Sequence, residues 1–361
     1  MIDEEYMRLA LQMAESTQGQ TSPNPAVGAI VVNNGNVVGM GAHLQAGQAH
    51  AEVHALSMAG DQAEGATIYI TLEPCSHFGK TPPCANLIIE KNIKRAVIAT
   101  LDPNPDVGGQ GVKKLEQAGI EVTTGVEKEK AYWLNRYFFH FIRTGTPYVT
   151  LKTAASLDGK TATNSGESQW ITGSKAREDS HVLRHQHDAI LVGIGTVLQD
   201  DPTLTARLKN GANHPIRVVL DRHLRIPLSA KMLQDDYASV WVFCSKEADN
   251  NKMELLEKAG VSVFPCSTSS VDIKEVLQTL AENQVLSVYV EGGASVHGSF
   301  LEAKAFQEMV CYMAPKLIGG KAAPSVIGGE GIASITEVPH VNIRSVEHVG
   351  NDLKITTVYK E

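Results

Sequence analysis

The chain has 361 residues, of which 43% are hydrophobic and 20% charged, and its formal net charge is −8. This length predicts about two domains of roughly 150 residues each, and the apolar fraction excludes a disordered chain. No apolar run reaches the ~20 residues of a membrane-spanning helix, and the acidic start lacks the positive head of a secretory signal. The five cysteines are an odd number, which argues against a disulfide framework. A reducing cytoplasm is therefore the expected compartment.

The first 145 residues are expected to alternate helix and strand. An amphipathic helix should begin the chain, with one face formed by Ile2, Tyr6, Leu9 and Met13. Two β-runs at 27–32 and 37–40 flank Asn34 and Gly35, a pair that supplies the positive φ of a tight hairpin. The further expected helices are 51–59, 85–91, 112–118 and 131–142, and the further expected strands are 67–72, 95–100 and 120–122.

A domain boundary is expected at residue 145. Gly145 followed by Pro147 is a typical stop signal for a helix. Beyond it, strands are expected at 148–153, 189–192, 217–220, 239–243, 261–264, 286–290, 310–313 and 353–358. Helical stretches lie between several of them. Strands that alternate with helices in both halves indicate two α/β domains, 1–145 and 146–361.

The strongest local signal is a group of metal-binding residue types in the first half. His50 precedes Glu52 by two positions, and Cys75 and Cys84 follow. Imidazole and thiolate suit Zn²⁺, and three protein ligands leave the fourth tetrahedral position open for water. The alternative is a structural zinc site with His54 as its fourth ligand. The open catalytic site is favoured, because Glu52 is near enough to move protons without binding the metal.

Three motifs of the first half resemble a known family. They are SPNPxVG at 22–28, HAE at 50–52 and TLEPCSHxGKTPPC at 71–84. Zinc nucleobase deaminases carry H-x-E followed by P-C-x-x-C, whereas eight residues separate Cys75 from Cys84 in this chain. The longer spacing is normal in the bifunctional riboflavin-biosynthesis deaminase–reductase family, which the chain resembles over nearly its full length.

The resemblance implies a cytidine-deaminase-like α/β/α domain in the first half. This domain would hydrolytically deaminate 2,5-diamino-6-(5-phosphoribosylamino)pyrimidin-4-one. His50, Cys75 and Cys84 would bind zinc, and Glu52 would carry protons from water to the leaving ammonia. The residues that would contact the base and its ribose phosphate are Asn24, His43, Ala51, His77 and Lys80. Asn24 offers a donor and an acceptor to a pyrimidine edge, although Pro-Asn-Pro is also a good turn on its own.

Three segments of the second half place small and polar residues at the expected ends of strands: 152–160, 192–202 and 289–299. In the third, a strand leads through glycines into a helix start, where backbone N–H groups can approach a phosphate. Such turns are also common for steric reasons alone. The segments resemble the reductase half of the same family, whose α/β fold is like that of dihydrofolate reductase. The resemblance implies NADPH as hydride donor and reduction of the ribosyl group of 5-amino-6-(5-phosphoribosylamino)uracil to ribityl.

The same resemblance implies the residues of the reductase site. Those that would line the cofactor are Ala154, Trp170, Thr196, Asp200, Gly293, Ala294, Ser295, Val296, His297, Gly298 and Ser299. Those that would line the substrate are Ser168, Arg184, Leu204, Arg207 and Glu291. Arg184 and Arg207 suit a phosphate clamp, because guanidinium groups bind phosphate oxygens in bidentate fashion. Trp170 could as readily be a core aromatic. The groups expected to handle protons are Lys152, Asp200 and Glu291.

Three functions compete at this point. They are a two-domain enzyme that acts on small phosphorylated pyrimidines, an RNA-directed zinc deaminase with an appended binding domain, and a non-catalytic zinc-stabilised scaffold. Residues 1–145 hold 11 Lys and Arg against 15 Asp and Glu, and the remainder holds 21 against 25, so each half has a net charge of −4. Polyanion binding needs clustered cations, so neither nucleic acid nor a membrane is an expected partner. Glu52 argues against the scaffold, and the two-domain enzyme, as a homo-oligomer, is the prediction.

Overall fold

The computed structural model describes residues 2–76, 82–104 and 108–360. The chain divides into two compact units, Met1–Gly145 and Thr146–Glu361. The division falls where a helix ends at Gly145 in the left-handed region of backbone space. Each unit is a mixed α/β structure, as the alternation of elements predicted. None of the described helices is long and apolar enough to cross a membrane.

A five-stranded sheet with the order β2-β1-β3-β4-β5 forms the centre of the described part of the first unit. Its strands are β1 (Gly28–Asn33), β2 (Asn36–Ala42), β3 (Thr67–Ile70), β4 (Arg95–Ile98) and β5 (Glu121–Thr124). β1 runs antiparallel to β2 and β3, whereas β3, β4 and β5 are parallel. The predicted hairpin is confirmed, because Asn34 and Gly35 both have positive φ at the turn between β1 and β2.

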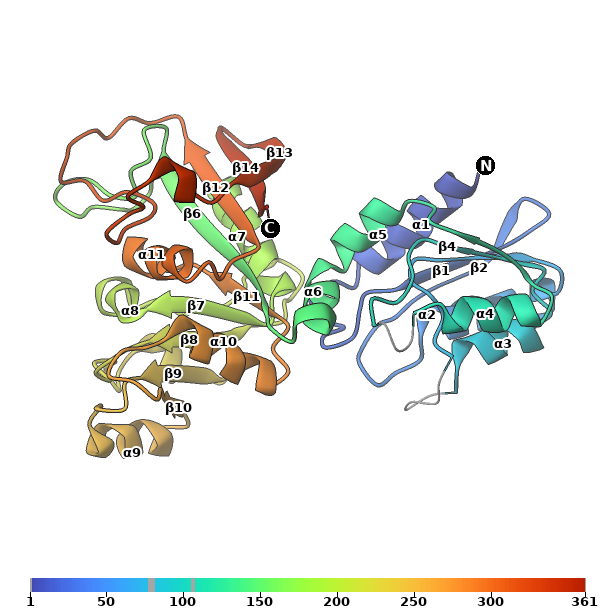
Figure 1. The fold of residues 1–361 in the computed structure, drawn as a ribbon, viewed down its shortest axis with the longest axis horizontal. Helices are drawn as coiled ribbons and strands as arrows, with labels where there is room; N and C mark the ends of the chain where they lie inside the picture. The colour runs from blue at the N-terminus through green and yellow to red at the C-terminus, as the bar shows by residue number, and fades with distance from the viewer. Residues whose placement is uncertain (1, 77–81, 105–107, 361) are drawn as a thin grey trace. The chain divides into compact units, whose positions relative to one another are not determined.

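Helices cover both faces of this sheet (Figure 1). The helices are α1 (Asp3–Glu15), α2 (Ala51–Ala59), α3 (Cys84–Glu90), α4 (Gln110–Gln117), α5 (Lys128–Leu134) and α6 (Arg136–Thr144), with a 3-10 turn at Gly60–Ala63. Side chains of α1 and α5 share one core cluster with Ile30 and Val97 of the sheet. Side chains of α2, α3 and α4 share another with Ala29 and Ile68. The unit is therefore a three-layer α/β/α sandwich.

The buried face of α1 differs from the predicted one. Tyr6 is buried as expected, but Ile2 and Leu9 are exposed. The buried side chains of α1 are Tyr6, Met7, Ala10, Leu11 and Ala14. The cause is the close approach of the helix to β1, since a Cβ atom on Gly28 would lie 2.0 Å from the carbonyl oxygen of Ala10. Gly28 permits this contact because it has no Cβ, and with Ala10 facing the strand Leu9 lies on the outer side of the helix.

The predicted helix 131–142 is in fact two helices, α5 and α6, which meet at Asn135. Asn135 is buried, and its side-chain amide exchanges two hydrogen bonds of 2.8 Å with the backbone of Ala26. Asn side chains that bond to the backbone offer an alternative to helical hydrogen bonding. This long-range contact sets the break, and the local sequence pattern does not reveal it.

The sheet of the second unit has nine strands among the described residues, in the order β10-β9-β8-β7-β11-β6-β12-β14-β13. The strands are β6 (Tyr148–Ser156), β7 (Ala189–Gly193), β8 (Ile216–Leu220), β9 (Val240–Cys244), β10 (Ser262–Pro265), β11 (Ser287–Val290), β12 (Glu308–Ala314), β13 (Val341–Val349) and β14 (Asp352–Tyr359). From β10 to β12 in this order the neighbours are parallel. β14 is antiparallel to β12 and to β13.

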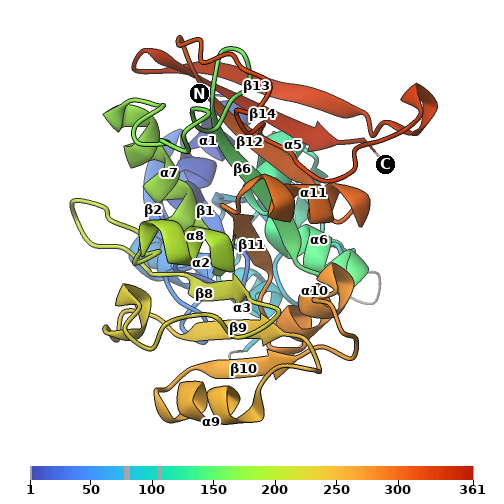
Figure 2. The same ribbon diagram turned by 90° about the vertical axis from the view of Figure 1, so that its left-hand side faces the viewer.

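Two groups of helices cover the two faces of this sheet (Figure 2). The helices are α7 (Ser174–Gln186), α8 (Ile194–Asp200), α9 (Asn250–Lys258), α10 (Ile273–Glu282) and α11 (Ala294–Glu302), with 3-10 turns at Lys231–Leu233 and Ile335–Glu337. Side chains of α7, α8 and α9 pack in one core cluster, and those of α10 and α11 pack in the other. α7 and α8 therefore lie on the same side of the sheet, where they can share a pocket.

The sequence predicts no strand over 341–349, yet β13 lies there. β13 is the edge strand and pairs only with β14 among the described residues. Most of its apolar side chains do not face a core: Ile343 and Val346 are 67% and 55% exposed, and Val349 at the strand end packs against a core cluster. A register shift between Ile343 and Ser345 also interrupts the alternation of apolar and polar residues. The segment therefore lacks the regular alternation of buried apolar and exposed polar residues from which a strand is predicted.

Candidate active sites

Three chain segments bring His50, Cys75 and Cys84 together in the first unit. His50 directly precedes α2, Cys75 follows β3, and Cys84 is the first residue of α3. α2 packs closely on β2, because Cβ atoms on Gly39 and Gly41 would lie 2.1 and 2.4 Å from carbonyl oxygens of the helix. The two glycines thus permit the close packing that sets the position of His50.

The three donor atoms have the separations that a tetrahedral zinc site requires. His50 Nδ1 lies 3.7 Å from Cys75 Sγ and 3.3 Å from Cys84 Sγ, and the three atoms lie within 4.8 Å of one another. Zinc–sulfur and zinc–nitrogen bonds of about 2.3 and 2.0 Å at tetrahedral angles separate such atoms by about 3.5 Å. The residues therefore fit Zn²⁺. In the part of the chain that the structure describes, the cluster has three donors, and His54 is not among them.

The two cysteines influence each other's protonation. Hydrogen bonding by the Cys84 side chain, and then by His50, lowers the pKa of the Cys75 thiol to about 4. The backbone N–H of Cys84 also donates to Cys75 Sγ at 3.3 Å. The same contact with Cys75 raises the pKa of the Cys84 thiol. The close contact thus favours the thiolate form at Cys75, and a metal ion would require deprotonation of both thiols.

A cavity of about 430 Å³ opens onto this cluster, and His50, Cys75, Glu52, Asn24 and His43 all line it. Glu52 is 3% exposed. Burial raises the pKa of its carboxyl group to about 7. A carboxyl group with such a pKa can both accept and release a proton near neutral pH.

Asn24 and His43 form a hydrogen-bonded pair in the same cavity. His43 Nδ1 lies 3.2 Å from the carbonyl oxygen of Ala49, and His43 Nε2 lies 3.1 Å from Asn24 Nδ2. The carbonyl needs a donor, so we assign the ring proton to Nδ1, and Nε2 then accepts from the Asn24 amide. Burial lowers the pKa of His43, which favours this neutral form. The backbone N–H of Asn24 also closes a turn onto Thr21, so the residue serves both the turn and the cavity.

The other predicted contacts of the deaminase site are differently placed. Ala51 is fully buried in a core cluster and is not among the described residues that line the cavity. His77 and Lys80 lie outside the described residues. Further lining residues that the sequence analysis missed are Glu73, Asp102 and Phe138. Phe138 belongs to α6 and carried no motif, whereas Glu73 stands inside the TLEPC motif and was there to be noticed.

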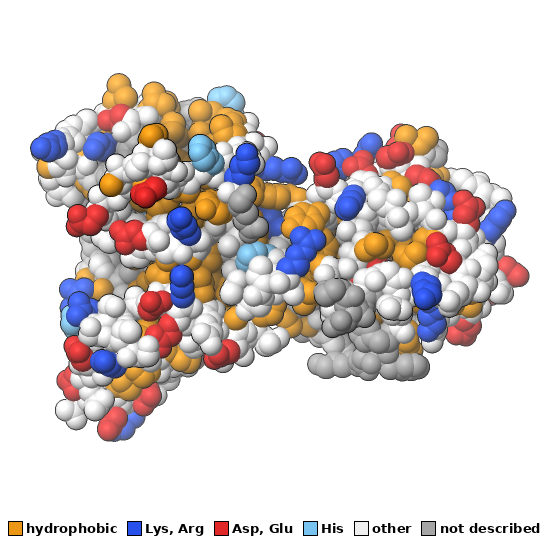
Figure 3. All heavy atoms as spheres, in the orientation of Figure 1, with side chains coloured by type: hydrophobic (Ala, Val, Ile, Leu, Met, Phe, Trp, Pro, Cys, Tyr) orange, Lys and Arg blue, Asp and Glu red, His pale blue; other side chains and the backbone are white. Residues whose placement is uncertain are grey.

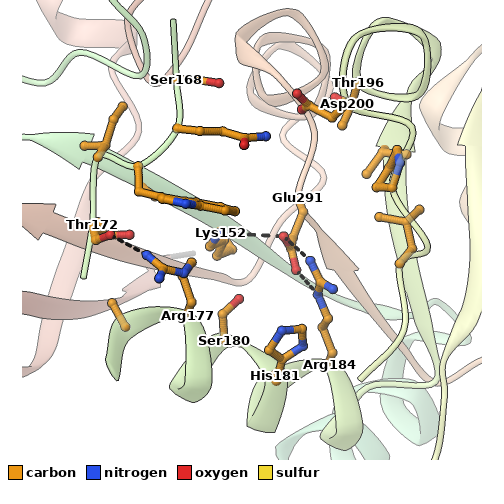
Figure 4. Close-up of a pocket in the computed structure, with 18 of the residues that line it drawn as sticks. Lys152, Ser168, Thr172, Arg177, Ser180, His181, Arg184, Thr196, Asp200 and Glu291 are labelled. Carbon is orange, nitrogen blue, oxygen red and sulfur yellow. Dashed lines mark hydrogen bonds and ion pairs between the residues drawn. The ribbon is translucent and has the colours of Figure 1, made fainter. Parts of the chain in front are cut away.

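A second cavity, of about 660 Å³, lies in the second unit among β6, α7 and the segments that follow β7 and β11 (Figure 4). It brings together every predicted substrate residue of the reductase, the groups expected to handle protons, and four of the predicted cofactor residues. These residues are Lys152, Ala154, Ser168, Trp170, Arg184, Thr196, Asp200, Leu204, Arg207 and Glu291. One pocket therefore unites segments that are more than a hundred positions apart in the chain.

Glu291 is the centre of an ion-pair network in this pocket (Figure 4). Arg184 Nε and Nη2 donate to its two carboxylate oxygens at 2.6 and 3.0 Å, and Lys152 Nζ lies 3.6 Å from Oε2. Burial by itself would raise the pKa of Glu291, but the charges of Arg184 and Lys152 lower it to about 2. Glu291 is therefore ionised at neutral pH and accepts hydrogen bonds there without donating a proton.

Arg184 and Arg207, the expected phosphate clamp, both line this pocket but have different partners. Arg184 Nη1 donates to the carbonyl oxygen of Thr205 at 3.0 Å, and its other two nitrogens donate to Glu291. Among the contacts that the structure describes, these use three of the five N–H donors of the guanidinium, and Arg184 also lines the cavity. Arg207 is exposed, and its Nε and Nη2 lie 3.3 and 3.2 Å from His181 Nε2. Arg207 is therefore the more accessible of the two arginines, and their shared role as a phosphate clamp stays a prediction.

His181 is a residue that the sequence analysis missed. Burial, together with the charges of Arg184 and Arg207, lowers the pKa of its imidazole to about 4. The ring is therefore neutral at pH 7, and its Nε2 can accept hydrogen bonds from Arg207.

α7 supplies the signal that could have revealed these residues. Besides Arg184, this helix lines the cavity with Ala176, Arg177, Ser180 and His181, which recur at the three- and four-residue spacing of one helical face. The guanidinium of Arg177 lies 4.4 Å from the centroid of the Trp170 ring. Trp170 is 62% exposed and lines the pocket, so it is not a core aromatic.

The segment 293–299 leads from β11 into α11 and is not part of the described lining of the cavity. A Cβ atom on Gly292 would lie 2.5 Å from Val296 Cβ, and one on Gly298 would lie 2.4 Å from the carbonyl oxygen of Gly328. The two ring nitrogens of His297 lie 3.1 and 3.3 Å from the carbonyl oxygens of Val326 and Val290. Gly292, His297 and Gly298 therefore pack against the protein, whereas Ser295 and Ser299 are exposed, and the backbone N–H groups at the start of α11 are of the kind that can approach a phosphate.

The fold and the two sites define a protein with a zinc-dependent nucleobase deaminase unit and a reductase unit. Residues 1–100 match the cytidine and deoxycytidylate deaminase zinc-binding region, and residues 147–355 match the RibD C-terminal domain. The riboflavin biosynthesis protein RibD of Bacillus amyloliquefaciens is 53% identical over 100% of this chain and 97% of its own length. RibD of Escherichia coli K12 is 40% identical over 98% of both chains.

Solved structures show the same relationship. Acinetobacter baumannii RibD, form 1, is 39% identical, covers 99% of both chains and has a TM-score of 0.89. A diaminohydroxyphosphoribosylaminopyrimidine deaminase/5-amino-6-(5-phosphoribosylamino)uracil reductase of Thermotoga maritima is 36% identical, covers 99% of both chains and has a TM-score of 0.88. The chain belongs to the RibD family of riboflavin biosynthesis proteins.

As a family member, the chain is a bifunctional riboflavin-biosynthesis enzyme with a deaminase and a reductase domain, and it uses zinc and NADPH. The predicted folds, one like cytidine deaminase and one like dihydrofolate reductase, are confirmed. Of the three competing functions, the family supports the two-domain enzyme.

Proposed function

We propose that residues 1–145 deaminate 2,5-diamino-6-(5-phosphoribosylamino)pyrimidin-4-one, and that residues 146–361 then reduce the ribosyl group of 5-amino-6-(5-phosphoribosylamino)uracil with NADPH. The observation that carries the proposal is the three-donor cluster of His50, Cys75 and Cys84 in one cavity with Glu52 and Asn24. The name of the Thermotoga maritima relative supports these two substrates.

In the deaminase site, Zn²⁺ held by His50, Cys75 and Cys84 would lower the pKa of a coordinated water to about 7. Glu52 would accept a proton from the attacking water and return it to the leaving amino group, since its pKa of about 7 suits both steps. Asn24, oriented by His43, would hold the edge of the pyrimidine. The proposal keeps Ala51, His77 and Lys80 as contacts of the base and ribose phosphate, on the strength of the family resemblance alone.

In the reductase site, NADPH supplies the hydride that adds to ribose C1′ of the opened sugar. Lys152 would deliver the proton that the sugar-bound nitrogen takes up, because its neighbour Glu291 is ionised and can only accept. Arg207 would bind the phosphate, with Ser168 and Leu204 beside it on the substrate. Ala154, Trp170, Thr196 and Asp200 would contact the cofactor, whose phosphates would meet the start of α11 at residues 293–299.

The expected partners are small molecules and further copies of the chain. On the face shown in Figure 3, Lys and Arg side chains are interspersed with Asp and Glu, which supports a small anionic substrate over nucleic acid. The exposed apolar side chains Ile343 and Val346 on the edge strand β13 support a homo-oligomer. The five cysteines form no disulfide, which agrees with a cytoplasmic enzyme.

A coupled assay tests the proposal. The zinc-loaded full chain is mixed with the diaminopyrimidine ribotide and NADPH, and ammonia release and NADPH absorbance are followed together. We expect ammonia to appear first and NADPH to be consumed in equal amount. A full chain that releases no ammonia from this compound would refute the proposed substrate.

A further inference from the structure

Glu73 makes an unusual set of contacts beside the zinc cluster. It is 7% exposed, and each of its carboxylate oxygens accepts two backbone N–H groups. Oε2 accepts from Asp102 at 3.1 Å and from Gly109 at 2.9 Å. Oε1 accepts from Gly111 at 2.8 Å and from Val112 at 3.1 Å. One side chain thus satisfies four backbone donors, two of which belong to the first turn of α4.

The backbone around Glu73 is shaped to this contact. Gly109 has a φ of +82°, a region that glycine enters without strain. A Cβ atom on Gly111 would lie 2.2 Å from the carbonyl oxygen of Pro74 and 3.1 Å from Glu73 Oε1. Residues 108–111 read Gly-Gly-Gln-Gly, so the start of α4 can lie directly on the Glu73–Pro74 backbone. Two independent features, the four hydrogen bonds and the missing Cβ, therefore hold the same two segments together.

The segment held in this way leads directly to a zinc ligand. Pro74 joins Glu73 to Cys75, whose sulfur lies 3.7 Å from His50 Nδ1 and accepts from the backbone N–H of Cys84 at 3.3 Å. The backbone N–H of Glu73 also donates to the carbonyl oxygen of Thr100 at 2.9 Å. The chain is thus fixed two residues before the ligand, on the sheet side and on the α4 side.

We propose that Glu73 is a positioning residue for the zinc ligand Cys75, which it acts on by fixing the start of α4 against the Pro74 carbonyl. The proposal rests on the zinc site assigned above and does not depend on the identity of the substrate. Groups that orient metal ligands from outside the coordination sphere change metal affinity or activity by about 10- to 100-fold when they are replaced.

Glu73→Gln tests the role with almost no change in size. An amide has one accepting oxygen, so in either orientation its NH₂ group faces two backbone N–H donors that the carboxylate now satisfies. Glu90→Gln is the matched control, because Glu90 ends α3, is exposed, and makes no side-chain hydrogen bond among the contacts that the structure describes. Gly111→Ala is the second probe, since it keeps the carboxylate and disturbs the same junction from the α4 side, where the added Cβ would lie 2.2 Å from the carbonyl oxygen of Pro74 and 3.1 Å from Glu73 Oε1.

Three readouts separate positioning from general stability. They are the rate of zinc release to a chromogenic chelator, the thiolate absorption band of the Co²⁺-substituted chain, and kcat and KM for ammonia release. We expect Glu73→Gln to release zinc about tenfold faster or more and to shift the Co²⁺ band. We expect kcat to fall by a similar factor while KM stays within about twofold, because the ligand geometry changes and the substrate contacts do not. The calorimetric unfolding transition of the first unit reports whether the part of the chain that holds Glu73 remains folded.

Two results would overturn the proposal. One is zinc release and a Co²⁺ band in Glu73→Gln that equal those of Glu90→Gln. The other is a rise in KM alone, which would make Glu73 a wall of the cavity and no more. Should Glu73→Gln fail to fold, Gly111→Ala decides the matter: faster zinc release with a shifted Co²⁺ band supports the role, and unchanged values refute it. Neither metal readout needs a substrate, so the test stands apart from that of the proposed reactions.

Discussion

The two active sites of this molecule differ in how strictly chemistry restricts their residues. In the deaminase site, three donor atoms of specified type must meet at about 3.5 Å, and those of His50, Cys75 and Cys84 do so. In the reductase site, charged residues form ion pairs with one another, as Glu291 does with Arg184 and Lys152. A metal site can thus be recognised from residue type and order, whereas the use of each charge in a polar pocket depends on which partner the fold places beside it.

Removal of a zinc ligand should separate the two sites most strongly. Cys84→Ala takes away one of three donors, so we expect loss of bound zinc and loss of ammonia release, with reductase turnover within about twofold of wild type because the site lies in the other compact unit. Metal analysis and the two rates measure this. Cys244→Ala, at a buried cysteine of β9, is the matched control and should keep its zinc. A Cys84→Ala chain with full zinc content would contradict the ligand assignment.

Glu52→Gln should give a smaller but still large effect within the same site. The amide fits the same space and cannot carry a proton, so kcat for ammonia release should fall by about 10²- to 10⁴-fold. Zinc content should stay at the wild-type level, because Glu52 is not a member of the described donor cluster. Equal turnover by the variant and the wild type would show that another group moves the proton.

The deaminase site was largely predictable from the sequence. The ligands, Glu52 and Asn24 stand in short motifs, and the fold brings His43, which stands in none of them, into the same cavity. Two things escaped the sequence analysis for a physical reason. Asn135 splits a helix through hydrogen bonds to Ala26, more than a hundred positions away. Glu73 stands inside the TLEPC motif, but its partners are backbone N–H groups, which every residue type except proline carries, so the motif shows the residue and not its contacts.

For the reductase site, the sequence indicated which residues would line the substrate, but not which partner each of them contacts. The residues expected to line the substrate do share one pocket. Nothing in the sequence tells that Arg184 is held by Glu291 and Thr205, because those partners come from β11 and from a loop that follows α8. The helical spacing of His181 and Arg184 on α7 was visible, but its meaning depends on which face of that helix meets the sheet.

Loss of the buried partner of Glu291 should affect stability first. Arg184→Met leaves an ionised carboxylate in the pocket with only Lys152 near it, at 3.6 Å. Breaking a buried ion pair by removing one partner costs about 3–5 kcal/mol. We therefore expect the calorimetric unfolding transition of the second unit to move down by about 10 °C, and that of the first unit to stay in place. Arg222→Met is the control, because Arg222 is an exposed arginine of the same unit that has no ion pair or side-chain hydrogen bond among the contacts that the structure describes. An unshifted second transition would mean that the ion pair contributes little.

Arg207→Ala should change binding and leave stability nearly unchanged, because this side chain is exposed. A charge-assisted contact with a phosphate contributes about 1.5–3 kcal/mol, so KM for the deaminated intermediate should rise about tenfold or more with kcat little altered. Arg207→Lys keeps a point charge without the planar fork and should fall between the two. An unchanged KM would remove Arg207 from the phosphate site.

His181 should have the smallest effect, and its pH dependence sharpens the contrast between the two arginines. His181→Phe removes the acceptor that holds Arg207, and the loss of one such hydrogen bond should raise KM about threefold. The pKa of His181 is lowered to about 4 by burial and by the charges of Arg184 and Arg207. The neutral ring therefore accepts from Arg207 at pH 6–8. This hydrogen bond is lost as the pH falls through about 4, because the imidazolium can no longer accept. The substrate phosphate titrates near pH 6, but this affects the wild type and His181→Phe alike. The KM of His181→Phe divided by that of the wild type therefore isolates the effect of His181. That ratio should stay near three down to about pH 5 and approach one below it. His181→Gln, which retains an acceptor, should keep its KM close to wild type across the range. A ratio that already falls at pH 6.5 would show that the imidazole titrates normally and does not hold Arg207 as the structure indicates.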